Sequence, residues 1–471
     1  AAVGIKVTYR KAQALFRQAG AAVDETTGAV KIPEQLVRWA VSQAPKQFIL
    51  YGNDPLLRFA VGGDSSSPLF AGLGTPTRII DLYSGEVRPT TLADAVDHLI
   101  LIDACNHIHN SQMDIWANDI PMTTIHAEAI WEWVHHSRKT YGMGCYGYLP
   151  TLDMMRMMSI AVGGKAELQK RPRFMAICSV VSPMQMDQAQ AEGLLICAEY
   201  GQPLAISPEA IAGMTAPVTL AGLVAQENAA ILAHITLAQI FRPGAPVLYG
   251  TVSTVANMRH GIVALGAAET GLITAASGQM ARYYGLPCRS VGGATESKSE
   301  DLQAGAERMG TLLPAVLAGV DYITCAGTLD STLLESHAVL MLDDDLCGMA
   351  ARLARGIEVN EESLPLDLLE RIGFSGNYLS EEHTTRHFRS ELFLPRFMIR
   401  EPYETWKEGD RRLAVDLARG RARQILSEHR PYPVDPAMEN ELDEYRQRVK
   451  GRTLEDFYRY EVDEMQDWNT L

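Results

Sequence analysis

The fold of this chain is indicated by residues 287–349, which read PCRSVGGATESKSEDLQAGAERMGTLLPAVLAGVDYITCAGTLDSTLLESHAVLMLDDDLCGM. The segment begins with a short apolar run, 287–293, that ends in two glycines, as a buried strand does, and the polar cluster 294–298 follows it. Apolar side chains then recur at helical spacing from Leu302 to Val320. A second apolar run, 322–327, ends in another polar turn. This order of strand, polar loop, helix and strand is typical of a parallel sheet, where function lies in the loops after the strands.

The same unit recurs along much of the chain. Strand-like apolar runs followed by helix-like stretches begin near residues 70, 107, 141, 174, 203 and 247, ahead of the two units described above. Eight units, mostly about 30 to 40 residues apart, predict a closed (β/α)8 TIM barrel over residues 66–350, and a doubly wound open sheet is the alternative. Residues 1–65 predict a small N-terminal α/β appendage. Residues 351–471 predict a helical C-terminal extension that packs on the barrel or on a partner subunit.

Composition narrows the class of protein. The chain has 471 residues, of which 47% are hydrophobic, enough for a large buried core. Its formal net charge of −15 argues against nucleic-acid binding, which needs a basic face. Seven cysteines without a Cys-x-x-Cys pair predict reduced thiols in a cytoplasmic protein. The sequence shows neither a signal peptide nor a run of about 18 uninterrupted apolar residues, so we expect neither export nor a membrane span. Because the sequence starts at Ala1 rather than at methionine, we expect further residues before it.

One glycine-rich motif has to be weighed. Residues 142–147, GMGCYG, match the dinucleotide-binding pattern Gly-x-Gly-x-x-Gly after a strand-like run. That pattern needs an acidic residue about twenty positions on, at the end of a second strand. Glu167 has the spacing but lies in a polar stretch before the next strand. We therefore favour close backbone packing at the barrel mouth over nucleotide binding.

Possible metal ligands are equally ambiguous. His383 and His387 are four residues apart and share a helix face, as zinc ligands can, but Thr384 stands where a zinc protease has glutamate. The run Asp343–Asp345 predicts an acidic helix start rather than a cation site, because three successive carboxylates point in different directions on a regular element. We predict no protein-bound metal.

The polar residues after the seventh and eighth strands are the strongest candidates for a binding site. Glu296 and Lys298 follow one strand, while Glu335 and His337 follow the next. On a barrel these two loops lie side by side at the active end, although solvated loop charges are the alternative interpretation. Aromatic rings near other strand ends, together with a carboxylate, are typical of a cage for a quaternary ammonium, where each ring contributes about 0.5–2 kcal/mol.

Several fragments resemble the trimethylamine methyltransferase superfamily. They are QENA (226–229), PGAPVLYG (243–250), GATESK (293–298), LMLDD (340–344) and EHTTRHF (382–388). The resemblance implies a TIM barrel that moves a methyl group from a methylated amine to the Co(I) of a separate corrinoid protein. Members that demethylate trimethylamine carry pyrrolysine, whereas this sequence contains only standard residues. It therefore resembles the branch without pyrrolysine, whose known substrates are quaternary amines such as glycine betaine, proline betaine and carnitine.

This resemblance and the strand positions lead to one hypothesis about the site. We expect Trp116, Tyr146 and Tyr249 to form the cage, Glu296 to supply negative charge and His337 to bind a substrate carboxylate. No catalytic nucleophile and no tightly bound cofactor is expected, because a cognate corrinoid protein supplies the cobalt nucleophile and the barrel only orients an N–CH3 bond and excludes water. We also expect a homo-oligomer. A metal-assisted barrel hydrolase and a betaine-binding protein without turnover are the alternative functions.

Overall fold

The structure is a computed structural model that describes residues 3–63, 67–111, 115–145, 147–374 and 376–457. At its centre eight parallel strands form one sheet in the order β10-β11-β13-β15-β18-β19-β6-β9. A parallel bridge between Asn110 and Thr140 joins β9 to the start of β10 and closes the sheet. This confirms the predicted (β/α)8 barrel and excludes the open sheet. The strands are β6 (Leu69–Gly72), β9 (Ile108–Asn110), β10 (Tyr141–Gly144), β11 (Phe174–Val180), β13 (Leu204–Pro208), β15 (Val247–Thr251), β18 (Cys288–Val291) and β19 (Tyr322–Ala326).

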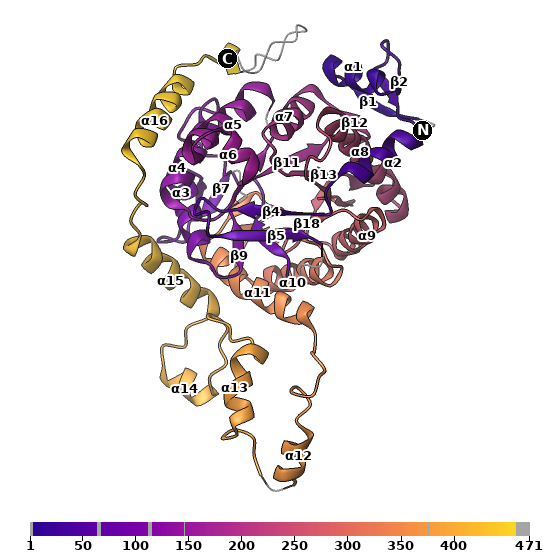
Figure 1. Ribbon diagram of the computed structural model, residues 1–471. Helices are drawn as coiled ribbons and strands as arrows, with labels where there is room; N and C mark the ends of the chain where they lie inside the picture. Colours follow the sequence, from indigo (N-terminus) through magenta and orange to yellow (C-terminus); the bar gives the residue numbers. More distant parts are fainter. Residues whose placement is uncertain (1–2, 64–66, 112–114, 146, 375, 458–471) are drawn as a thin grey trace.

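A ring of helices surrounds these strands (Figure 1). The longest, α8, is long and apolar enough by length and composition to cross a membrane, but half of its apolar window is buried and it packs on β13 and β15. We therefore assign it to the barrel wall. The ring consists of α3 (Leu92–Ala104), α4 (Ile125–His136), α5 (Tyr148–Val162), α7 (Gln188–Glu199), α8 (Leu220–Phe241), α9 (Ala268–Tyr284), α10 (Leu302–Leu317) and α11 (His337–Arg355), with the short α6 (Lys165–Lys170) after α5.

Both faces of every barrel strand are buried, one against the barrel interior and the other against the helices. On β15, Leu248 packs in the interior cluster with Leu69, Met175 and Tyr322, whereas Tyr249 packs in the outer cluster. Because side chains alternate along a strand, the direction of one residue sets the direction of its neighbours. Because Leu248 faces the barrel interior, Tyr249 faces the helices.

The N-terminal segment packs against the barrel and closes one of its ends. Its first strand pairs in parallel with β12 (Gln185–Met186), which follows β11. The β4–β5 hairpin contributes Phe48, Leu50 and Val61 to the interior cluster at the amino end of the strands. The carboxyl end is therefore the open one. The segment contains β1 (Ile5–Val7), α1 (Arg10–Gln18), β2 (Ala22–Val23), β3 (Ala29–Lys31), α2 (Glu34–Gln43), β4 (Gln47–Tyr51) and β5 (Arg58–Gly62).

Two small sheets extend the strands at the carboxyl end. One has the order β20-β21-β7-β8 and the other β14-β16-β17. They carry the loops that surround the open end of the barrel. Their strands are β7 (Arg78–Ile80), β8 (Val87–Pro89), β14 (Ile211–Ala212), β16 (Thr254–Asn257), β17 (Ile262–Ala264), β20 (Thr328–Leu329) and β21 (Leu334–Glu335).

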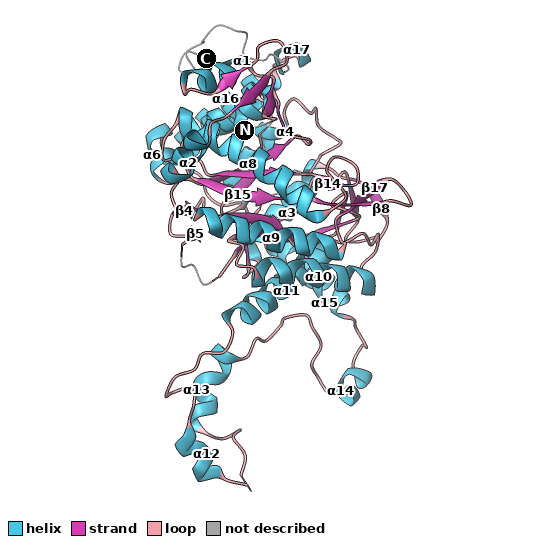
Figure 2. Cartoon of the chain, turned by 90° about the vertical axis from the view of Figure 1, so that its right-hand side faces the viewer, coloured by secondary structure: helices cyan, strands magenta, loops and turns pink. Residues whose placement is uncertain are grey.

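The C-terminal residues divide into a packed part and a projecting part. Helix α15 packs on α11 and α3, and α16 packs on α4 and α5. Between α11 and α15, residues 357–374 and 376–392 form an arm that extends away from the barrel (Figures 1 and 2), and its helices bury none of their residues. The helices are α12 (Leu366–Ile372) and α13 (Glu382–Glu391) in the arm, then α14 (Tyr403–Glu408), α15 (Ala414–Glu428), α16 (Pro436–Lys450) and α17 (Leu454–Phe457).

Candidate functional site

A cavity of about 700 Å³ opens at the carboxyl end of the barrel strands. This is the end at which TIM barrels carry their active sites. Its apolar wall comes from strand ends and from the β16–β17 hairpin, with Leu73, Ile177, Val252, Val263 and Leu265 among the lining residues. Its polar residues include Ser179, Glu209, Arg289, Glu296 and Asp330.

Arg289 is the charged residue that lies within a barrel strand. It sits on β18, and its side chain is 3% exposed. Its Nη2 donates a hydrogen bond to Thr324 Oγ1 on β19 at 3.1 Å, while Nε and Nη1 have no hydrogen-bond partner. Burial lowers the pKa of Arg289 to about 10, so the guanidinium remains protonated at neutral pH. A protonated, incompletely paired guanidinium therefore lines the cavity.

Two carboxylates in the cavity lack a cationic partner. Glu209 follows β13 and accepts a hydrogen bond from Ser179 Oγ at 2.9 Å. Glu296 accepts from the backbone N–H of Gly266 at 3.1 Å and from the hydroxyl of Ser331. Among the described residues, no lysine, arginine or histidine nitrogen lies within the 4 Å of an ion pair with either of them. The cavity therefore presents two uncompensated negative charges beside an uncompensated positive one.

Asp330 differs from these two, because it is already neutralised. Its carboxylate forms ion pairs with Arg78 at 2.8 Å and with Lys298 at 3.1 Å. Its backbone N–H donates to Ser297 O, so the loops after β18 and β19 lie side by side as the sequence predicted. Asp330 therefore ties these loops together and is a weaker candidate for binding a cation.

The loop that follows β19 is strained where it lines the cavity. Asp330, Ser331 and Thr332 have φ angles of 50°, 49° and 77°, which are unusual for residues other than glycine and most unusual for a β-branched one. Neighbouring structure holds the loop in place, since Ser331 N–H donates to Thr295 O at 2.9 Å. Strain of this kind costs about 1–3 kcal/mol per residue and concentrates at functional sites.

Of the residues that the sequence predicted for the site, Glu296 lines this cavity. Tyr249 faces the helices instead, where its hydroxyl donates to Asn228 Oδ1 at 3.0 Å and its ring stacks on Tyr284. Trp116 is 37% exposed in the segment after β9, and it is not among the residues that line the cavity. Tyr146 lies outside the described residues.

His337 is also placed outside the cavity. It starts α11, is buried, and its Nε2 has no hydrogen-bond partner. Burial lowers the pKa of His337 to about 4, so its imidazole is uncharged at neutral pH and lacks the charge expected of a carboxylate ligand. The structure therefore does not assemble the described members of the predicted cage.

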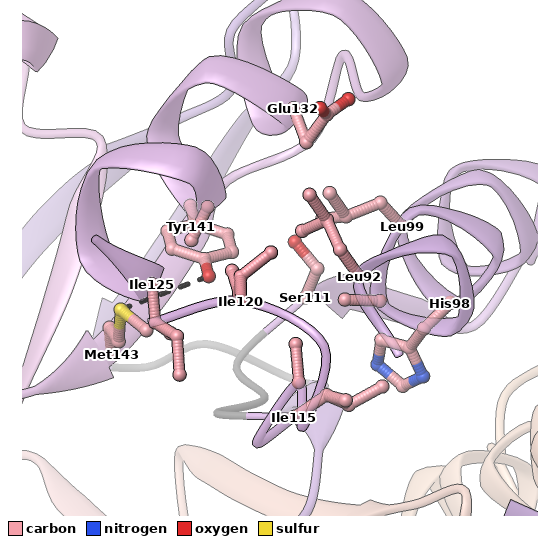
Figure 3. Close-up of a pocket in the computed structure, with 13 residues that line it drawn as sticks. Leu92, His98, Leu99, Ser111, Ile115, Ile120, Ile125, Glu132, Tyr141 and Met143 are labelled. Atoms are coloured by element: carbon pink, nitrogen blue, oxygen red, sulfur yellow. Dashed lines mark hydrogen bonds between the residues drawn. The ribbon is translucent and has the colours of Figure 1, made fainter. Parts of the chain in front are cut away.

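A second hollow lies between the outer face of β10 and the helices α3 and α4 (Figure 3). Tyr141 and Met143 point into it from β10, and Leu92 and His98 reach it from α3. Its volume is about 30 Å³. Because a cavity measured in this way needs about 10–15 Å³ to hold one water molecule, this hollow has room for only a few waters and is too small for an organic substrate.

The other motifs have structural places. Asp343, Asp344 and Asp345 lie in the middle of α11, so the prediction that they start a helix is wrong. They do point in different directions: Asp343 pairs with Arg308, Asp344 accepts backbone N–H groups after α3, and Asp345 accepts those of residues 396 and 397. His383 and His387 lie on α13, in the projecting arm. In the described part of the chain, no group of three or more His, Cys, Asp or Glu side chains is arranged to hold a metal ion.

Comparison with known proteins identifies relatives over almost the whole chain. The family described as trimethylamine methyltransferase (MTTB) matches residues 1–453. Glycine betaine methyltransferase of Desulfitobacterium hafniense (strain Y51) is 31% identical over 445 residues, which cover 94% of this chain and 92% of that protein. Trimethylamine methyltransferase MttB of Methanosarcina barkeri (strain Fusaro) is 30% identical over 440 residues, covering 92% and 88%.

A solved structure shares the fold. The monomethylamine methyltransferase MtmB of Methanosarcina barkeri superposes with a TM-score of 0.50 and 11% sequence identity. The match covers 95% of this chain and 86% of that one. At this identity the likeness concerns the fold alone.

Proposed function

Since this chain belongs to the trimethylamine methyltransferase family, we propose that it takes a methyl group from a quaternary amine and passes it to the Co(I) of a corrinoid carried by a separate protein. Glycine betaine or a related betaine is the proposed donor, in line with the relative that is 31% identical. The observation that carries the proposal is the pair of unpaired carboxylates, Glu209 and Glu296, in a largely apolar cavity at the open end of the barrel.

A quaternary ammonium fits this lining. It has no N–H to donate, so a protein recognises it by charge and shape rather than by hydrogen bonds to nitrogen. The described residues that line the cavity include no aromatic ring. We therefore assign the charge recognition to Glu209 and Glu296 and the contacts with the methyl groups to apolar side chains such as Ile177 and Val252.

In the proposed reaction no side chain has to act as a nucleophile or as a general acid. When the N–CH3 bond breaks, its electron pair stays on nitrogen and the cation becomes a neutral tertiary amine, so no proton donor is required. The protein has to orient one N–CH3 bond toward the acceptor and to exclude water. The acceptor can approach from the open carboxyl end, beside the β16–β17 hairpin, where Ile262 is 49% exposed.

The test is a methyl-transfer assay with cob(I)alamin as acceptor and a panel of quaternary amines, read as the spectral change to methylcobalamin. The wild type should methylate cobalamin with at least one betaine. Glu209→Gln and Glu296→Gln should each lower kcat/KM by about 10- to 100-fold, because each removes a charge that faces the donor. Glu86→Gln is the matched control, since Glu86 is exposed in the β7–β8 turn and does not line the cavity.

Two results would count against this function. Full activity in both cavity variants would place the donor elsewhere. Binding of a betaine, seen as a thermal shift, without methyl transfer to free cobalamin or to a corrinoid protein would favour the binding protein over the enzyme.

We further propose that the arm mediates self-association. Leu366, Leu369 and Leu379 are 65%, 50% and 84% exposed, and no part of the described chain covers them. A copy of the same chain is the proposed occupant, because most soluble oligomers are symmetric homo-oligomers. Size-exclusion chromatography with light scattering should show a larger mass for the wild type than for Leu366→Asp/Leu369→Asp, whose barrel should keep its melting temperature. A monomeric wild type would refute this proposal.

A further inference from the structure

Two neighbouring strands of the barrel place buried polar groups without hydrogen-bond partners in its interior. Arg289 on β18 is paired in register with Tyr322 on β19. Tyr322 lies in the interior cluster, and its hydroxyl has no hydrogen-bond partner. Arg289 Nε and Nη1 are also unpartnered. Three buried donor groups on adjacent strands thus face inward without an acceptor.

Burial makes these unpaired groups energetically costly unless a hydrogen-bond acceptor or a counter-ion pairs with them. An unpaired charge inside a protein costs several kcal/mol, and buried polar groups are almost always hydrogen-bonded. Glu209 attracts Arg289 electrostatically, but no described carboxylate oxygen lies within 4 Å of its guanidinium. The missing partner is therefore an anion small enough to enter the barrel.

The charges are ordered along the barrel axis. Through the strand register, Cys288 pairs with Tyr249 and Tyr249 with Ile206, so Arg289 is in register with Ser207. Glu209 comes two residues after Ser207, just past the end of β13 and about 7 Å further along the strand direction toward the open end. Positive charge therefore lies deep in the cavity, and negative charge lies near its mouth.

We propose that Arg289, assisted by the Tyr322 hydroxyl, binds the carboxylate of a zwitterionic quaternary amine, so that the enzyme selects amino-acid betaines over trimethylamine and over cations such as choline. A planar guanidinium matches a carboxylate through two parallel N–H···O bonds. With its carboxylate on Arg289, the donor directs its trimethylammonium group toward Glu209 and the open end. This inference rests on the proposed function and names the substrate class.

Three ligands of similar shape separate the two ends of such a substrate. Glycine betaine has both charges, 3,3-dimethylbutyrate keeps the carboxylate but has a neutral carbon in place of nitrogen, and choline keeps the ammonium without the carboxylate. Affinities are measured by isothermal titration calorimetry on the wild type, Arg289→Gln, Arg289→Lys and Tyr322→Phe. No methyl transfer is needed for this readout.

Arg289→Gln should weaken glycine betaine and 3,3-dimethylbutyrate by about 10- to 100-fold and leave choline unchanged, because one charge-assisted contact is lost. Arg289→Lys should recover part of this loss. Tyr322→Phe removes only a hydroxyl and should weaken the two carboxylates by about 3- to 10-fold. This variant also keeps the inference testable if Arg289→Gln does not fold, as judged by circular dichroism.

Failure of this inference can be told from failure of the proposed function. Equal losses for choline and glycine betaine in both Arg289→Gln and Tyr322→Phe would overturn the carboxylate site, as would unchanged affinities. Undiminished methyl transfer from glycine betaine in Arg289→Gln would overturn the inference while leaving the methyltransferase intact. A selective loss of carboxylate binding in a protein that transfers no methyl group would support the site and overturn the function.

Discussion

Glu227 on α8 provides a test of how a buried carboxyl group links barrel stability to pH. Its Oε2 accepts a hydrogen bond from Thr251 Oγ1 on β15 at 2.9 Å, and its Oε1 accepts one from Ser277 Oγ on α9 at 2.6 Å. Burial raises the pKa of Glu227 from 4.5 to about 7, although these hydroxyl groups lower it in part. The side chain thus joins a strand to two helices. Its burial costs little free energy only when the carboxyl group is protonated and therefore uncharged.

The sign of the effect follows from the two pKa values. Below pH 4.5 the carboxyl is protonated in both the folded and the unfolded chain and adds no pH dependence. Between pH 4.5 and about 7 the unfolded chain releases the proton while the folded chain keeps it, so the free energy of unfolding falls as pH rises. At about 1.4 kcal/mol per pKa unit, the full loss above this range is about 3 kcal/mol.

Glu227→Gln removes the titration and keeps the shape. Relative to the wild type, the free energy of unfolding of this variant should rise by about 2 to 3 kcal/mol between pH 5 and pH 8, measured by urea denaturation with circular dichroism. Comparing the two proteins at each pH cancels the other titrating groups. Glu269→Gln on α9 is the control, because Glu269 is exposed. A difference between Glu227→Gln and wild type that does not change with pH would refute the reasoning.

Three further predictions concern buried contacts and the strained loop. Asp343→Asn leaves the buried Arg308 without its counter-ion and should lower the free energy of unfolding by about 3–5 kcal/mol in urea denaturation. Asp153→Asn weakens the contacts that fix α16 on α5, so limited trypsin digestion should cut within α16, at Arg446 or Arg448, faster than in wild type. Thr332→Gly relieves the strain of a positive φ angle and should raise the free energy of unfolding by about 1 kcal/mol. A lower kcat/KM in the same variant would show that the strained loop conformation contributes to substrate binding in the cavity.

The barrel could be predicted because its signals are local and repeated. Each strand is a short apolar run that ends in polar or glycine residues, and each helix has its own apolar spacing, so eight units can be counted without tertiary information. Since parallel strands place their carboxyl ends on one edge, the same pattern also predicted that the loops with Glu296 and Asp330 would meet. Arg289 was overlooked, although a charge inside an apolar strand run is itself a signal.

The direction of each side chain could not be predicted in the same way. In a (β/α)8 barrel both faces of a strand are buried, so the alternation of polar and apolar residues that marks the inner face of other sheets is missing. Tyr249 and Leu248 are both apolar in the sequence, yet one packs on the helices and the other in the interior. The rotation of α11, which turns His337 away from the cavity, likewise depends on packing.

Sequence alone determined the architecture and the family of this protein, because hydrophobic periodicity and motif order are properties of neighbouring residues. Tertiary structure alone decided which polar groups face the cavity and which of them lack partners. The reason is that the relevant atoms come from distant parts of the chain, as when Arg289 meets Thr324 and Glu296 meets Ser331. Only closure of the barrel brings these groups together and leaves a buried positive charge below two unpaired negative ones.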